Sequence, residues 1–189
     1  MRKGKGKIGV NPKPKKKNLK GDVIPILSDA PLSFDFSQKD WLKSINQKEF
    51  TNKLESENMF AKYIFELFYK LIPTIQQNWK EIIRSAGTGN WKHCHPVKEE
   101  KLDSVIHILE HIHGHQFRTA ATSGPSLWQF GISQNIRLIA IHDYKNNFLT
   151  PVFIDYHHQI HPSIKYNKTE YSRYEFCPFC KYIHNKVVN

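Results

Sequence analysis

The sequence predicts an α+β protein in which a helical N-terminal half packs on a small antiparallel β-sheet, preceded by a disordered basic arm. Apolar residues recur every three or four positions in the first half, the period changes to alternation in the second half, and the N-terminus has almost no large apolar side chains. We expect an arm over 1–21 and one domain over 22–189, helical over 37–115, with a sheet over 126–162 and a C-terminal tail over 163–189.

The N-terminal arm carries most of the excess positive charge. Nine of the 28 lysines and arginines precede residue 21, with no acid among them, which leaves 19 cations against 17 acids in the rest of the chain. Four glycines and two prolines add to the entropy cost of ordering this segment. Such charge predicts a polyanionic partner, RNA first and DNA as the alternative. The residues expected to contact phosphates are Lys13, Lys15, Lys16, Lys17 and Lys20.

Composition also excludes several classes of protein. No stretch has the continuous apolar length of a signal peptide core or of a membrane span. The three cysteines are too few, and odd in number, for a secreted domain built on disulfides. We therefore expect a soluble, cytoplasmic protein with no membrane partner.

Helices are predicted along most of the first half. Residues 23–36 contain two prolines and should form an extended strap, after which Ser37 resembles the start of a short helix. The apolar spacing over 57–71 predicts a longer helix that Pro73 should end or kink before a continuation. A further helix is expected over 99–113.

Alternating aromatic and β-branched residues predict an antiparallel meander in the second half. The expected strands are 126–133, 136–143 and 148–155, joined by short polar turns. Pro151 cannot donate a hydrogen bond to a neighbour, so the third strand should lie at an edge or contain a bulge there. Trp128 and Phe130 share one face of the first strand and are expected to lie in the core rather than to stack on bases.

Two cysteines separated by two residues suggest half of a structural zinc site. Cys177 and Cys180 have the spacing of thiolates on one turn around a tetrahedral ion. The favoured further ligands are Cys94 or His95, with His93 and His184 as competitors. Metal-free thiols and a redox-active pair are the alternatives. A zinc ion shared between residues near 94 and residues near 180 would fasten the tail to the helical half.

Basic and imidazole side chains of the sheet half are candidates for phosphate chemistry. Guanidinium groups bind phosphate oxygens, and imidazoles transfer protons near neutral pH. The candidates are Arg118, Arg137, His142, His157 and His158. Alternation along the preceding strand lets at most one of the two adjacent histidines face Arg137. Each of these residues has a solvated or structural role as its alternative.

The order of elements over about 100–162 resembles the sheet of the RelE/ParE-like toxin superfamily. The residues that carry the resemblance are Ser126-Leu-Trp-Gln-Phe, Ile136-Arg-Leu-Ile-Ala-Ile-His-Asp and the apolar strand that begins at Phe148. Ribonuclease members of that superfamily cut RNA without a metal. The resemblance implies that Arg137 stabilises the phosphate and that His157 or His158 acts as acid or base.

The leading hypothesis is therefore a toxin-like, metal-independent endoribonuclease whose arm attracts RNA. The first alternative is a zinc-stabilised nucleic-acid-binding or ribonucleoprotein component without catalytic activity. The second is an interaction protein whose arm docks on an acidic partner. The sequence leaves open whether a protein inhibitor exists.

Overall fold

The computed structural model of the chain describes residues 31–47, 49–115, 117, 126–131, 136–161 and 169–183. The expected basic arm with its five phosphate-contacting lysines, most of the strap, Arg118 and His184 lie outside these residues. The helices, the sheet and the cysteine pair lie within them.

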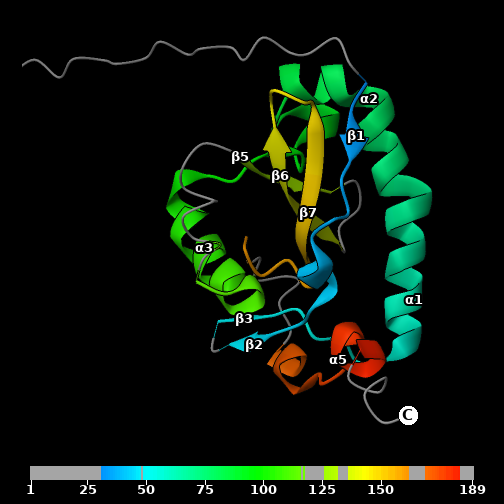
Figure 1. The fold of residues 1–189 in the computed structure, drawn as a ribbon, viewed down its shortest axis with the longest axis vertical. Helices are drawn as coiled ribbons and strands as arrows, with labels where there is room; N and C mark the ends of the chain where they lie inside the picture. Colours follow the sequence, from blue (N-terminus) through cyan, green and yellow to red (C-terminus); the bar gives the residue numbers. More distant parts are fainter. Residues whose placement is uncertain are drawn as a thin grey trace, which may run out of the picture.

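The centre of the fold is a five-stranded mixed sheet (Figure 1). Its order is β1 (Ser33–Phe34), β7 (Phe148–Asp155), β6 (Arg137–Asp143), β5 (Ser126–Phe130) and β4 (His95–Pro96). All neighbours pair antiparallel except β1, which lies parallel to β7. The expected α+β class and the antiparallel meander of the last three long strands are confirmed, while the two short outer strands were not predicted.

The bulge expected at Pro151 is present. Ile139 pairs with Phe153 and Ala140 pairs with Pro151, so Val152 is the extra residue on β7. A bulge leaves one residue outside the regular ladder, which suits a proline that has no N–H to donate. β1 pairs with Phe148 and Leu149 of β7 and does not reach Pro151, so the proline is not required to donate a hydrogen bond to β1.

One long helical rod covers one face of the sheet (Figure 1). It consists of α1 (Glu57–Glu66), a π-helical turn (Leu67–Leu71) and α2 (Ile72–Arg84). Ser56 caps its start by accepting a 3.3 Å hydrogen bond from the N–H of Met59. Pro73 does not end the rod, because the wider π turn just before it accommodates the missing N–H and the bulk of the ring.

The opposite face of the sheet is covered by α3 (Glu99–His113) (Figure 1). Its predicted range is confirmed, and Gly114 ends it with φ of 92°, a conformation that glycine adopts without steric cost. Neither α3 nor any other helix among the described residues combines the length and apolarity needed to cross a membrane.

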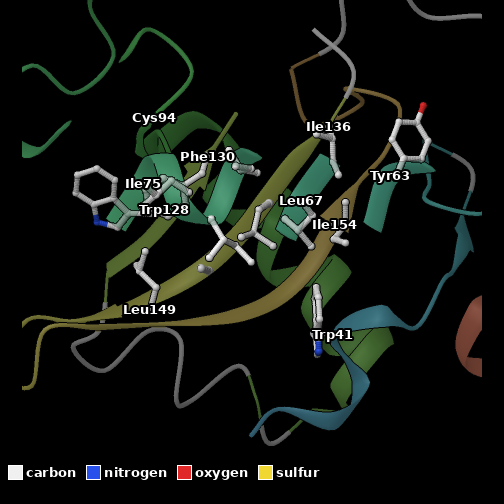
Figure 2. Packing of buried hydrophobic residues seen from close by; sticks show 14 of the residues in the cluster. Trp41, Tyr63, Leu67, Ile75, Cys94, Trp128, Phe130, Ile136, Leu149 and Ile154 are labelled. Carbon is white, nitrogen blue, oxygen red and sulfur yellow. The ribbon is translucent and has the colours of Figure 1, made fainter. Parts of the chain in front are cut away.

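Alternation along the strands divides the core into two layers. Leu138 and Ala140 pack with the long rod, whereas Ile139 packs with α3. Trp128 and Phe130 stack with ring centroids 5.7 Å apart inside the first layer, as expected (Figure 2). Both faces of the sheet are therefore buried, which explains the nearly continuous apolar runs of the strands.

The helix expected from Ser37 is a single 3₁₀ turn (Lys39–Leu42). The N–H and the hydroxyl of Ser37 donate to the carboxylate of Asp35 at 2.9 and 2.8 Å, so the side chain does not cap the turn. A short hairpin follows, formed by β2 (Asn46–Gln47) and β3 (Phe50–Thr51).

Backbone pairing attaches the described part of the C-terminal tail to the domain. Leu54 and Phe176 exchange two N–H to C=O hydrogen bonds of 3.0 Å each. The short helix α5 (Pro178–Ile183) follows this bridge and carries the second cysteine of the pair. The tail is thus held near α1 by main-chain contacts in addition to any metal.

Candidate active site

A buried arginine lies at the start of β6, on the face of the sheet that α3 covers. Arg137 is only 1% exposed and pairs in register with Asp155 of β7. On its other side, β5 has just ended at Gly131, where a Cβ atom would lie 2.5 Å from Nη1 of Arg137. A residue with a side chain would therefore collide with the guanidinium group, and glycine is what makes room for it.

Asp155 fixes the turn that follows β7. It is fully buried, and its carboxylate accepts hydrogen bonds from the N–H groups of His157 at 3.1 Å and Ile160 at 2.9 Å. His158, inside this turn, has a left-handed φ of 61°. Burial raises the pKa of Asp155, whereas burial lowers the pKa of Arg137 to about 10 against the opposing attraction of Asp155. The two buried groups thus lie close enough for Asp155 to act on the pKa of Arg137, and the guanidinium group itself donates from Nη1 to the carbonyl oxygen of Ile136 at 2.8 Å.

Four histidines from two loops gather beside this pair, and we call them the histidine cluster. Its members are His93, His95, His158 and His161. The rings of His93 and His158 lie 6.0 Å apart, and those of His95 and His161 lie 5.8 Å apart. His93 lies in the loop before β4, His95 is the first residue of β4, and the last two residues come from the turn after β7. The order of the sheet and the Asp155 turn bring together segments that are more than 60 residues apart.

Three members of the histidine cluster are uncharged at neutral pH. The pKa values of His93 and His158 are lowered to about 4, mainly by burial and secondly by the nearby positive charge of Arg137. Burial, followed by the neighbouring His95, lowers the pKa of His161 to about 4. The Nε2 atom of His161 is buried and has no hydrogen-bond partner among the described residues. The cluster thus presents neutral imidazole nitrogens beside a fixed cation.

This arrangement suits anionic substrates and proton transfer. A neutral imidazole can accept a proton, and a phosphate group placed beside it raises its pKa and lets it return one. Arg137 adds a positive charge that does not titrate in the physiological range. The chemistry therefore matches the transfer of a phosphoryl or acyl group under general acid–base catalysis.

The structure brings Arg137 and His158 together. The sequence predicted that at most one of the two adjacent histidines, His157 and His158, would face Arg137. His157 points the other way, since its Nε2 atom lies 2.6 Å from the carbonyl oxygen of Lys53. Its ring stacks on Tyr171 at 4.2 Å and is buried. His157 therefore fastens the turn to the β3 strand and to the tail.

His142 lies near the other end of β6, away from Arg137. It is fully buried, packs edge-on against Trp79 at 4.8 Å and shares a hydrogen bond of 3.4 Å with Asn147. Burial lowers the pKa of His142, so the side chain is a neutral member of the core. The structure does not bring His142 to the histidine cluster.

The candidate zinc ligands lie in separate places. Cys94 is fully buried, and its thiol donates to the carbonyl oxygen of Gly131 at 3.5 Å, whereas Cys177 and Cys180 lie at the start of α5. In the part of the chain that the structure describes, no three histidine, cysteine, aspartate or glutamate side chains are grouped to hold a metal ion. The structure therefore does not bring Cys94 or His95 to the cysteine pair.

Sequence reasoning did not assign His93 and His161 to the arginine. The sequence does contain a hint of this grouping. His93 and His95 stand on either side of Cys94, and His158 and His161 follow the strand that ends at Asp155. An aspartate in that position commonly accepts hydrogen bonds from the next backbone N–H groups and folds the chain back.

The fold and the histidine cluster together define a three-layer α+β protein with an arginine-based site at one end of its sheet. Residues 37–184 match the family described as Uncharacterised protein UU032, and the chain belongs to this family. A relative of that description from Ureaplasma parvum serovar 3 (strain ATCC 700970) is 28% identical over 181 residues, which covers 95% of this chain and 97% of the relative. No solved structure matches the chain.

The resemblance to the RelE/ParE-like toxin superfamily is wrong. The matching family covers the helical half, the sheet and the cysteine pair as one unit, and it is a different family. The apolar patterns around Trp128 and Arg137 reflect strands that are buried on both faces, a property shared by many meanders. Arg137 is also enclosed beside Asp155 rather than displayed on an open sheet.

Replacing Gly131 with alanine tests the close approach of Arg137. The new Cβ atom would lie within 2.9 Å of Nη1, Cδ and Cζ of the arginine, so we expect a loss of about 1–3 kcal/mol in the free energy of unfolding. In an Arg137→Lys background, which lacks the guanidinium carbon and nitrogens, the same change should cost clearly less. Urea unfolding of the four proteins measures both values. An equal cost in both backgrounds would show that the collision is not with the guanidinium group.

The low pKa values of the histidine cluster predict a pH-dependent stability. An unfolded histidine has a pKa near 6.5, and His93 and His158 have pKa values of about 4 in the fold, so protonation favours the unfolded state. Their contribution is complete above pH 6.5 and is lost as the pH falls towards 4. A His93→Gln/His158→Gln variant should therefore lose less Tm than the wild type over that range, by on the order of 2–4 °C.

The exposed histidines of α3 provide the control for this pH series. His107→Gln/His111→Gln changes the same number of imidazoles outside the cluster. Thermal unfolding of this variant should follow the wild-type pH profile. Parallel profiles for the cluster variant and the wild type would contradict the assignment.

Proposed function

We propose that the protein binds RNA and cleaves its phosphodiester backbone at the histidine cluster, beside Arg137. The observation that carries the proposal is that His93 and His158, from segments far apart in the sequence, meet beside the buried guanidinium group of Arg137, with a second imidazole pair formed by His95 and His161. The lysine-rich N-terminal sequence supports a polyanionic substrate. We place the activity in the cytosol, in keeping with three free cysteines.

The proposed reaction uses the ribose 2′-hydroxyl as the nucleophile. A neutral imidazole removes the proton of this hydroxyl, O2′ attacks the adjacent phosphorus, and the bond from phosphorus to O5′ breaks. A second imidazole, protonated when the phosphate binds, returns a proton to O5′. The products are a 2′,3′-cyclic phosphate and a 5′-hydroxyl, and the need for the 2′-hydroxyl selects RNA over DNA.

His93 and His158 are the favoured acid–base pair. Both rings lie close enough to Arg137 for its charge to depress their pKa values, and they lie 6.0 Å from each other. Positive charge at Arg137 would stabilise the extra negative charge of the pentacoordinate phosphorus. His95 and His161 flank this pair and are suited to hold neighbouring phosphate oxygens.

The alternative is a nucleic-acid-binding protein without catalytic activity. The burial of Arg137 against Asp155 favours it, because a cation that neutralises a buried carboxylate has a sufficient structural role. In that case the histidine cluster would only contact phosphates. Both hypotheses predict RNA binding, so only an assay of RNA cleavage distinguishes them.

RNA cleavage by the purified protein in EDTA tests the proposal. We expect His93→Ala and His158→Ala each to lower kcat/KM by about 10²–10⁴-fold, and Arg137→Lys to lower it as well. Because the general acid must be protonated and its pKa in the free protein is about 4, the wild-type kcat/KM should rise as the pH falls from 8 to 5. His111→Ala, which removes an exposed imidazole of α3, is the matched control and should leave cleavage unchanged.

Two outcomes would decide against catalysis. If the wild-type protein binds RNA tightly but does not cleave it between pH 5 and pH 8, the protein is a nucleic-acid-binding protein without catalytic activity. Cleavage that survives in both histidine variants would place the chemistry elsewhere in the protein.

We also propose that Cys177 and Cys180 hold a structural zinc ion. The Sγ atom of Cys177 accepts a hydrogen bond from the N–H of Cys180 at 3.2 Å, which holds the two cysteines on one turn, and His184 follows Cys180 by four residues in the sequence. The purified protein should contain about one equivalent of zinc, and Cys177→Ser should lose it. Cys94→Ala is the control that should retain it. Less than half an equivalent in the wild type, measured by elemental mass spectrometry, would reject the site.

A further inference from the structure

Four aromatic side chains lie in solvent on the outer side of the long rod and the adjoining strap, and we call them the aromatic patch. Their exposed fractions are 39% for Phe36, 62% for Phe65, 46% for Phe68 and 67% for Tyr69. Large apolar side chains in contiguous exposed positions usually mark a binding surface. None of these rings takes part in the histidine cluster.

The rings of the aromatic patch are arranged in two contacting pairs. Phe65 and Tyr69 are one helical turn apart and lie nearly parallel, with centroids 4.9 Å apart. Phe36 contacts Phe68 at 5.6 Å and also rests on the buried Trp41 at 5.5 Å. The packing holds the rings in place while leaving ring surface open to solvent.

Two exposed cations border the aromatic patch along the rod, while the carboxylates Asp35 and Glu66 beside it are partly buried. Lys62 and Lys70 are exposed on the same stretch of helix, three residues before Phe65 and one residue after Tyr69. The carboxylate nearest to them in sequence, Glu66, is only half exposed and lies close enough to Tyr63 to raise the pKa of that residue. Aromatic rings bordered by lysines fit bases and phosphates better than they fit an apolar protein surface.

The lysine-rich N-terminus enters the described fold beside this patch. The strap that leads to Phe36 runs along the rod, where the side-chain amide of Gln76 donates to the carbonyl oxygen of Leu32 at 3.4 Å (Figure 1). Lys20 precedes Phe36 by 16 residues in the sequence, which an extended chain spans in at most about 60 Å. The cations of the arm are thus tethered within reach of a strand that lies on the patch.

We propose that the aromatic patch is a stacking platform for the bases of single-stranded RNA. This inference rests on the proposed function, because it takes RNA as the partner. It adds a second RNA-binding surface, outside the histidine cluster. Bases would stack on Phe65 and Tyr69, whose open ring faces are independent of base identity. Lys62 and Lys70 would contact the phosphates.

Binding of a fluorescent oligouridylate to the full-length protein tests the platform. Phe65→Ala/Tyr69→Ala should weaken the affinity at least about tenfold, while the slope of affinity against salt concentration stays unchanged because the phosphate contacts remain. An abasic ribose-phosphate strand should bind the variant and the wild type equally. Tyr182→Ala removes another exposed aromatic ring, on α5, and is the matched control that should bind as the wild type does.

The outcomes separate this inference from the proposed function. The Phe65→Ala/Tyr69→Ala variant should cleave a dinucleoside monophosphate as fast as the wild type does, because the substrate is too short to reach the patch. Unchanged oligouridylate affinity in the variant would overturn the platform and leave the cleavage proposal intact. A wild-type dimer that the variant converts to a monomer, with RNA affinity unchanged, would assign the patch to self-association. No affinity of the wild type for RNA would overturn both proposals.

Discussion

The packing of Arg137 between Asp155 and Gly131 is the constraint on which this end of the molecule depends. Burying a guanidinium group requires a carboxylate nearby to offset its charge and enough room for its atoms. Asp155 pairs in register with Arg137 on β7, and Gly131, just past the end of β5, leaves the room. The same carboxylate accepts backbone hydrogen bonds from the following turn. One buried pair therefore positions the arginine and also shapes the loop that carries His158.

The electrostatics of the histidine cluster follow from that pair. Burial first, and the positive charge of Arg137 second, lower the pKa values of His93 and His158 to about 4, so both rings are neutral at pH 7. An arriving phosphate reverses the balance, because its charge favours protonation of the rings that it touches. In the reaction that we propose, proton uptake by the rings accompanies anion binding, and the burial that lowers their pKa values sets the conditions that acid–base chemistry needs.

Strong periodicity made much of the fold predictable from the sequence. The three long strands, the bulge at Pro151 and the end of α3 at Gly114 each have a local cause. The strands β1 and β4 have two residues each, too few to show a period, and were missed. The site was only half predictable: Arg137 and His158 were identified singly, but their meeting with His93 depends on β4 lying beside β5, which no local pattern encodes.

The aromatic residues also show how far local sequence patterns predict burial, and why the prediction stops there. Trp128 and Phe130 were correctly expected in the core, because strand alternation reports burial directly. The helical stripe could not distinguish Phe68 from its buried neighbours Leu67 and Leu71, since all three fit an apolar face. In the π turn before Pro73, the buried side chains are Leu67 and Leu71, four residues apart. The side chains between them point away from the core. The exposure of Phe68 and Tyr69 thus fits their place between the buried Leu67 and Leu71, a distinction that the apolar pattern of the sequence does not carry.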